Sequence, residues 1–360
     1  MFSNKEFEMF DGHFKGQSLM TLDMLIMMMN DKDNAYLRTN RFGSMSTGQD
    51  GRIVEGELIA VNDGCYGVFL GNTFNPLIYR GENKEYQEFV PSIDRRNYIT
   101  GNCDCCVDVI KKMIFLDWFR TTPYYTVCKN IQMNGHNMYF DFEAIAQHYE
   151  FPTSYIDISR DINVAMFFAY TYFKDGAYHP IVDFDEYKPC LYIGNLKDIY
   201  TKNKELLKLI SYQSVVRAYQ QKAMALDLTN SNGLKKLFLK VELPNMPEVA
   251  MGIYEHFVGG ELLMPSGKIN NYQDIVAKYA DIIRRTKVFS LEYVERYCGI
   301  YQKDINDIRF VLEKQGYEIT TGFEQFEISK NDLEVMYSDI DNGIKPFLNR
   351  LGFRPFGIIV

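Results

Sequence analysis

A hairpin signal in the first quarter of the chain most constrains the fold. Two apolar runs, residues 57–61 and 65–70, flank the turn sequence Asn62-Asp63-Gly64. An Asp-Gly pair supplies the positive φ angles of a tight turn, so the two runs are expected to pair as antiparallel strands. A third strand is predicted at residues 76–79, directly before Arg80 and Gly81. These strands indicate a sheet with antiparallel pairing.

The rest of the pattern mixes strands and helices. Short β-type runs are predicted at 155–158, 190–193, 223–228 and 237–243. Apolar spacing and capping residues predict helices at 18–29, 104–119, 141–149, 164–173, 201–219, 272–285, 290–299, 304–315 and 330–349. We therefore predict an α+β fold, with a mixed or antiparallel sheet core and inserted helices. Three segments are expected: a helical N-terminal extension (1–50), a sheet-containing domain (51–245) and a mostly helical C-terminal region (246–360).

Charge and hydropathy narrow the partner classes. The 360-residue chain has a formal charge of −8 and no basic run, which disfavours general electrostatic binding to nucleic acid or anionic membranes. The start of the chain lacks a signal pattern, and the apolar run 24–29 is far shorter than the ~18 residues of a membrane span. A cytoplasmic protein with free thiols and no membrane partner is expected.

The cysteines do not indicate a metal site. Cys103, Cys105 and Cys106 lie close together, with Cys128 and His136 downstream. Their Cys-x-Cys-Cys spacing lacks the paired Cys-x-x-Cys of a structural zinc site. We expect no metal cofactor.

The first candidate site is Tyr79-Arg80-Gly81-Glu82, at the end of an apolar strand. Glycine after the arginine is expected to let the backbone turn, so that the guanidinium points into a cleft. An arginine fork binds two oxygens of a phosphate or carboxylate at once. The alternative is a structural ion pair between Arg80 and a nearby acidic residue.

The second candidate site runs from Gln147 to Ser159. Polar side chains gather here inside an apolar region, and buried polar groups need partners, so they either satisfy one another or face a ligand. His148, at a helix end, could titrate near neutral pH or act as a structural hydrogen-bonding group. A third, weaker signal is Arg217 to Gln221, which precedes a predicted strand.

Together these stretches resemble the FRG domain family, which is named for an aromatic-Arg-Gly motif. The resemblance covers about residues 70–225. The matching motifs are Tyr79-Arg80-Gly81, Pro91-Ser92 with Arg95-Arg96, Gln147-His148-Tyr149, Pro152-Thr153, Asp157, residues 164–169 ending in Phe168-Ala169, and the later Arg217 and Gln221. The stretch from Gln147 to Ala169 is the most specific part.

The chain departs from the family pattern at several positions. Glu150 stands where the family usually has Gly, Ser154 where it has Arg, and Ile158-Ser159 where it has Trp-Thr, and the Gly after the late Gln is missing around Ala223. The order of Arg80, Ser159 and Gln221 is also similar to that of ADP-ribosyltransferase-type folds. That second likeness is one of fold only.

The resemblance implies that the site handles NAD as a substrate, by ADP-ribosyl transfer or NAD glycohydrolysis. Asp157 would stabilise an oxocarbenium-like ribose, and Arg80 would hold the pyrophosphate. His148 or Gln221 would bind ribose hydroxyls or orient a protein or nucleic-acid acceptor, although Gln221 cannot act as a base. The other expected ligand-binding residues are Tyr79, Gly81, Gln147, Thr153, Ser159 and Arg217.

Three alternatives remain open at this point. Asp157 could be the buried ion-pair partner of Arg80 rather than a catalytic group. The site could bind a nucleotide or a nucleic-acid end without catalysis, using some of the 26 tyrosines for stacking. The polar cluster could also be purely structural, with function residing in a partner surface of the C-terminal third. Toxin or anti-phage activity is the biological setting expected for the catalytic alternative.

Overall fold

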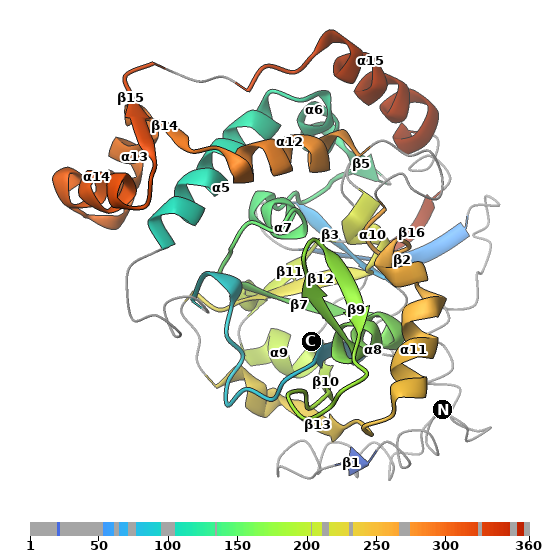
Figure 1. The fold of residues 1–360 in the computed structure, drawn as a ribbon. Coiled ribbons are helices and arrows are strands. Elements are labelled where there is room, and N and C mark those ends of the chain that lie inside the picture. The colour runs from blue at the N-terminus through green and yellow to red at the C-terminus, as the bar shows by residue number, and fades with distance from the viewer. Residues whose placement is uncertain are drawn as a thin grey trace.

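The protein was analysed as a computed structural model (Figure 1). The structure describes residues 20–21, 53–60, 65–70, 77–94, 105–133, 135–202, 204–210, 216–229, 233–265, 274–322, 326–345 and 351–355. Within these residues the fold is α+β, with a mainly antiparallel sheet at its core, as the sequence predicts.

Within the described residues, the large sheet has seven strands. Their spatial order is β1 (Met20–Thr21), β13 (Phe238–Glu242), β10 (Cys190–Asn195), β4 (Leu77–Glu82), β7 (Tyr155–Ser159), β12 (Ala223–Asp227) and β11 (Leu207–Leu209). β1 pairs with β13 in parallel, and the other neighbours pair antiparallel. The strand predicted before Arg80 is therefore central in this sheet.

Apolar residues on both faces of the sheet bury it between helices. On one face, α8 (Ile162–Tyr170) lies over β4, and α11 (Pro247–His256) packs against α8 (Figure 1). On the other face, α9 (Leu196–Lys202) and Phe89 cover β4, β7 and β10. Towards β12, the helices α7 (Phe142–His148) and α10 (Val216–Gln220) contact the sheet through small residues such as Ala144 and Ala218.

The predicted hairpin is confirmed, but it belongs to a separate sheet. β2 (Ile53–Ala60) and β3 (Tyr66–Leu70) pair antiparallel, and β16 (Leu351–Pro355) adds to β2 in parallel. The last described strand, β16, therefore lies beside a strand from the first quarter of the chain. Two short hairpins, β5 (Gln132–Met133) with β6 (His136–Asn137) and β8 (Thr171–Lys174) with β9 (Ala177–Pro180), complete the antiparallel pairs.

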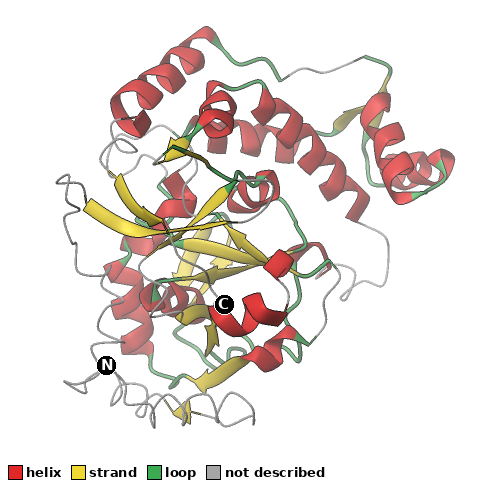
Figure 2. Ribbon diagram, turned by 180° about the vertical axis from the view of Figure 1, so that it is seen from behind, coloured by secondary structure: helices red, strands yellow, loops and turns green. Residues whose placement is uncertain are grey.

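A helical layer lies beside the large sheet (Figure 2). It comprises α5 (Cys105–Arg120), α6 (Pro123–Asn130), α12 (Ile275–Arg285), α13 (Leu291–Tyr301), α14 (Ile305–Lys314) and α15 (Lys330–Asp339), with a π-helical turn at Ile340–Ile344 and the parallel strands β14 (Val288–Ser290) and β15 (Glu318–Thr320). α12 and α13 pack on α5 around a shared apolar core. The boundary near residue 245 stays a prediction.

Three predicted helices are wrong in part. Met20–Thr21 form a strand rather than part of a helix starting at Ser18, and the rest of segment 1–50 lies outside the described residues. In the predicted helix 201–219, Leu207–Leu209 form β11 instead, because alternate leucines are buried while Lys208 is half-exposed. α8 ends at Tyr170, and Thr171 starts β8.

The other predicted helices and strands are confirmed, with ends shifted by a few residues. The predicted helix 330–349 is α-helical to Asp339 and continues in the π-helical turn, and its residues 346–349 lie outside the described residues. Short 3-10 turns lie at Lys204–Leu206, Leu234–Leu237 and Val258–Gly260. Among the described residues, none of the helices is both long and apolar enough to cross a bilayer.

Candidate functional site

The site is located where the central strands β4 and β7 separate. β4 pairs with β10 along its whole length, from Leu77 to Glu82, but it pairs with β7 only at Tyr79 and Ser159. The pairing between β4 and β7 therefore stops before Arg80 and Gly81, the next residues of β4. A polar gap opens within the sheet.

The side chain of Arg80 bridges this gap. Its Nη1 donates to the backbone oxygen of Asp157 at 2.8 Å, and its Nε donates to Oε1 of Glu82 at 3.0 Å. Glu82 also pairs with Lys235 at 3.4 Å, and both Arg80 and Glu82 are buried. A guanidinium has five N–H donors. Among the described residues, the N–H donors of Arg80 other than these two have no hydrogen-bond partner.

The structural ion pair that the sequence allowed for Arg80 therefore exists, but its partner is Glu82. The carboxylate of Asp157 does not neutralise Arg80, because the guanidinium contacts only the backbone oxygen of Asp157 among the described atoms. This removes the simplest structural explanation for the carboxylate of Asp157.

A relay of side chains orients that carboxylate instead. The hydroxyl of Thr153 donates to Oε1 of Gln147 at 3.0 Å, which fixes the amide so that Nε2 of Gln147 donates to Oδ1 of Asp157 at 2.5 Å. Thr153 is fully buried, and its backbone N–H donates to the hydroxyl of Ser92 at 3.0 Å. Within the described chain, Oδ2 of Asp157 has no hydrogen-bond partner.

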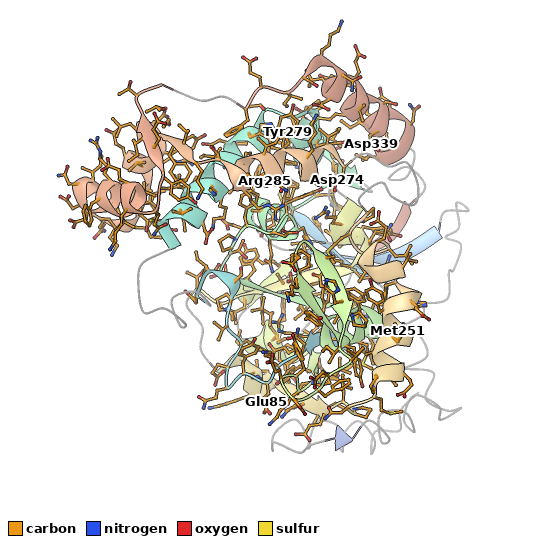
Figure 3. The ribbon with its side chains drawn as sticks, viewed as in Figure 1. Glu85, Met251, Asp274, Tyr279, Arg285 and Asp339 are labelled. Carbon is orange, nitrogen blue, oxygen red and sulfur yellow. The ribbon has the colours of Figure 1, made fainter. Side chains whose placement is uncertain are left out.

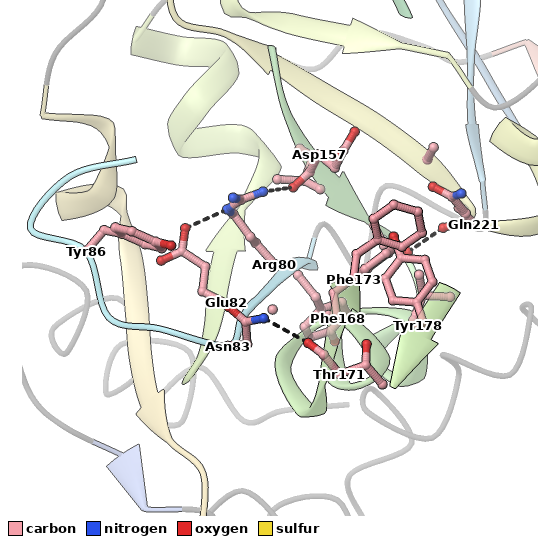
Figure 4. Close-up of a pocket in the computed structure, with 17 residues that line it drawn as sticks. Arg80, Glu82, Asn83, Tyr86, Asp157, Phe168, Thr171, Phe173, Tyr178 and Gln221 are labelled. Atoms are coloured by element: carbon pink, nitrogen blue, oxygen red, sulfur yellow. Dashed lines mark hydrogen bonds and ion pairs between the residues drawn. The ribbon is translucent and has the colours of Figure 1, made fainter. Parts of the chain in front are cut away.

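A cavity of about 330 Å³ lies at the gap (Figure 4). Its lining brings together six of the predicted site residues: Tyr79, Arg80, Gly81, Asp157, Ser159 and Gln221. The side of the cavity opposite Glu82 and Tyr86 is aromatic. There Phe173 lies beside Tyr178 with their ring centres 5.0 Å apart, and Phe168 lies nearby (Figure 4). Burial raises the pKa of Tyr178, so its phenol keeps its proton and can donate a hydrogen bond.

Ser159 and Gln221 link β7 to the end of α10. The hydroxyl of Ser159 donates to the backbone oxygen of Gln221 at 2.7 Å and accepts from the N–H of Asp161. The amide of Gln221 donates to the backbone oxygen of Leu263 at 3.4 Å. Both residues line the cavity while holding its wall in place.

His148 is buried behind the site and is not among the residues that line this cavity. Its Nε2 has no hydrogen-bond partner within the described part of the chain. Burial lowers the pKa of His148 to about 4, Asp157 opposes the shift, and Arg217 adds to it. His148 is therefore neutral at physiological pH, and its contact with a ribose stays a prediction.

Arg217 also points away from the cavity. Its Nε donates to Oδ2 of Asp274 at 3.2 Å, its Nη1 donates to the backbone oxygen of His148, and its guanidinium lies 4.6 Å from the ring centre of Tyr149. The hydroxyl of Tyr149 donates to Asp274 as well. This network ties α7 and α10 to the start of α12, which Asp274 caps (Figure 3).

Gly81 has a different role from the predicted turn. β4 continues through Gly81 to Glu82, so the backbone does not turn there. A Cβ atom at Gly81 would collide with the backbone oxygen of Ala165 in α8. Glycine is needed because the helix lies directly on the strand.

Sequence reasoning missed the aromatic wall of the cavity, which consists of Phe168, Phe173 and Tyr178. Phe173 and Tyr178 face each other across the β8–β9 hairpin, whose turn contains Asp175 and Gly176, both with positive φ. That Asp-Gly pair is the same hairpin signal that was recognised at residues 63–64. Lys235, which supports Glu82, comes from a 3-10 turn and has no comparable signal in the sequence.

No group of three or more potential metal ligands occurs among the described residues. The cavity offers a carboxylate, an arginine with donors to spare and aromatic rings. These groups suit a ligand that combines a phosphate, hydroxyls and a flat ring.

Comparison with known proteins identifies one family. No curated protein and no solved structure matches the chain. Residues 75–176 match the model of the FRG domain, a range that contains Arg80, the Gln147–Thr153–Asp157 relay, α8 and the aromatic hairpin. The chain therefore contains an FRG domain at residues 75–176.

Proposed function

We propose that the cavity between β4 and β7 binds NAD or a closely similar nucleotide and cleaves the bond between nicotinamide and ribose. The observation that carries the proposal is the combination of groups lining one cavity. Asp157 offers an oriented carboxylate, Arg80 offers N–H donors, and Phe168, Phe173 and Tyr178 offer ring faces.

Each group has a place in the reaction. When the bond between C1′ and the nicotinamide nitrogen breaks, its electron pair stays with nicotinamide, and positive charge develops on the ribose. The carboxylate of Asp157 stabilises that charge, and Gln147 keeps the carboxylate in position. Arg80 holds a phosphate oxygen, and the aromatic wall stacks on the nicotinamide ring. Water or an acceptor hydroxyl then bonds to C1′ and releases a proton to solvent.

The full chain incubated with NAD tests the proposal by mass spectrometry. Release of nicotinamide together with ADP-ribose, or with an ADP-ribosylated acceptor, is the expected result. A variant of the aromatic wall provides a second test. Phe173→Ala should raise the KM for NAD by about tenfold, because stacking on the ring is lost. Phe173 is 48% exposed, so its removal should leave folding intact. NAD that stays intact over many enzyme equivalents contradicts the catalytic proposal.

A second candidate function is nucleotide binding without catalysis. It is favoured by Gln221, whose side chain donates to Leu263 and offers no carboxylate at the late position of the motif order. In that case NAD or ADP-ribose should raise the melting temperature of the protein while the ligand is recovered unchanged. A melting temperature that no nucleotide shifts would contradict this function.

A further inference from the structure

A second, larger cavity lies between the sheet and the helical layer. Its volume is about 1140 Å³. It is lined by residues of α5, the end of α12, the segment after α7 and the segment before β15. Arg80 and Asp157 also line it, so they border both cavities. The family match ends at residue 176, so part of this cavity is formed by residues beyond the matched FRG segment.

The larger cavity gathers positive charge on an acidic protein. Among the described residues, five cationic side chains line it against three acidic ones, although the whole chain carries a formal charge of −8. The cations are Arg80, Lys111, Arg284, Arg285 and Lys287. Arg285 marks the cavity end of α12 in Figure 3. A local concentration of cations is the feature that attracts a multivalent anion.

Two of these cations have no carboxylate partner in the described chain. Lys111 is 7% exposed, and its Nζ donates only to the backbone oxygen of Arg284 and to the hydroxyl of Tyr317. Lys287 lies 4.3 Å from the ring centre of Tyr317. A buried ammonium without a counter-charge is costly, so the retention of Lys111 favours a role with an anion. Lys287 is exposed and adds charge at the mouth of the same cavity.

Arg284 adds to this positive field. It pairs with Glu150, but its Nε is buried and has no hydrogen-bond partner among the described atoms. Burial and the neighbouring Arg285 lower the pKa of Arg284. Basic residues at the end of α12 complement the helix dipole, but that dipole offsets only about half a charge. The dipole does not account for Lys287, which lies beyond the helix.

We propose that this larger cavity binds the phosphate groups of a nucleoside di- or triphosphate through Lys111, Arg285 and Lys287. Tyr317, a partly exposed residue that also lines the cavity, offers an aromatic ring to the base. The inference does not rest on NAD cleavage, because Lys111, Arg285 and Lys287 do not line the smaller cavity.

Isothermal titration of the full chain with ATP at fixed ionic strength tests the site. Lys287→Gln should weaken ATP binding by about tenfold, the loss expected for one charge-assisted contact. The matched control is Lys330→Gln, since Lys330 is 93% exposed on α15 outside the cavity, and this variant should bind ATP as the wild type does. No ATP binding, or equal affinity in the two variants, would overturn the proposal.

Two further measurements sharpen the test. Inorganic pyrophosphate should compete with ATP, and its failure to compete would overturn the assignment to phosphate groups. Lys111→Met should weaken binding without lowering the melting temperature, because it removes a buried uncompensated charge. ATP binding that is weakened in Lys287→Gln supports the site even in a chain that releases no nicotinamide, so this proposal and the NAD proposal can fail separately.

Discussion

Burial of His148 gives the protein a pH-dependent stability. Its pKa is lowered to about 4 in the fold, whereas an unfolded histidine titrates near 6.5. Between these values the unfolded chain binds the proton and the folded chain does not. The contribution of His148 is therefore fully present above about pH 6.5 and is lost as the pH falls towards 4.

We predict that the wild type loses about 2 kcal/mol more unfolding free energy between pH 7 and pH 5 than His148→Gln does. Urea denaturation at the two pH values measures this difference. His256→Gln, which changes an exposed histidine, should behave as the wild type. Equal pH dependence in His148→Gln and the wild type would show that His148 accepts a proton in the fold.

Glu150 shows how a departure from the family pattern can preserve the backbone. Its φ is 68°, a left-handed conformation that favours glycine, and glycine is the residue usual at this position in FRG domains. The side chain pairs with Arg284 on α12. The sequence revealed the substitution but not this pairing, because Arg284 is far away in the chain.

Ser154 is a second departure from the family pattern. It replaces a usual arginine, and its hydroxyl donates to Asp227 on β12.

At the level of elements, the close contact between β4 and α8 depends on Gly81. Gly81→Ala should destabilise the protein by about 1–3 kcal/mol, because the added methyl group meets the backbone of α8, which cannot move without disturbing the sheet. Chemical denaturation measures the loss.

Gly299→Ala is the matched control for this change. A Cβ atom at Gly299 would meet nothing within 4 Å, and the residue lies in α13. Alanine there should stabilise the helix by about 0.5–1 kcal/mol. A Gly81→Ala protein as stable as the wild type would contradict the packing described here.

The Arg217–Asp274 pair links α10, α7 and α12. Both side chains are nearly buried, with exposures of 10% and 3%. Arg217→Met should cost about 3–5 kcal/mol, since it leaves the carboxylate of Asp274 uncompensated. Adding Asp274→Asn should recover part of that loss, which a double-mutant cycle would measure.

Arg285→Met serves as the control, because Arg285 is 80% exposed and its pair with Asp281 lies at the surface. Its change in unfolding free energy should stay below about 1 kcal/mol. Additive effects of Arg217→Met and Asp274→Asn would mean that the two side chains do not stabilise each other.

Elements with strong local signals were predictable from the sequence, and long-range pairing was not. Asp161 caps α8 as expected, and Asp63-Gly64 separates two paired strands. The segment 201–219 was misread, because Leu207 and Leu209 become buried only when β11 pairs with β12. The separation of β4 from β7 has no local signal at all, and the cavity depends on it.

At the scale of the whole molecule, the FRG motifs divide into two groups. Arg80 and Asp157 reach the cavity, whereas His148 and Arg217 lie in the buried network behind it. The sequence motif does not show which of its residues line the cavity and which lie in the buried network, because tertiary contacts decide the position of each. In the same arrangement Arg80 and Asp157 border two cavities, one lined by aromatic rings and the other by cations.

The central claim is that the carboxylate of Asp157 acts on the ligand. Asp157→Asn keeps an oxygen that can accept the hydrogen bond from Gln147 but removes the charge. It is a better test than Arg80→Ala, which would leave Lys235 as the one remaining counter-charge of buried Glu82 among the described residues. Asp341→Asn, at a residue that is 59% exposed, is the matched control.

The most direct measurement is the rate of nicotinamide release from NAD by the wild type, Asp157→Asn and Asp341→Asn, with melting temperatures recorded in parallel. We expect Asp157→Asn to lower the rate by about a hundredfold or more with an unchanged melting temperature, as for loss of a group that stabilises transition-state charge. Asp341→Asn should match the wild type. Nicotinamide release that survives in Asp157→Asn would contradict the account.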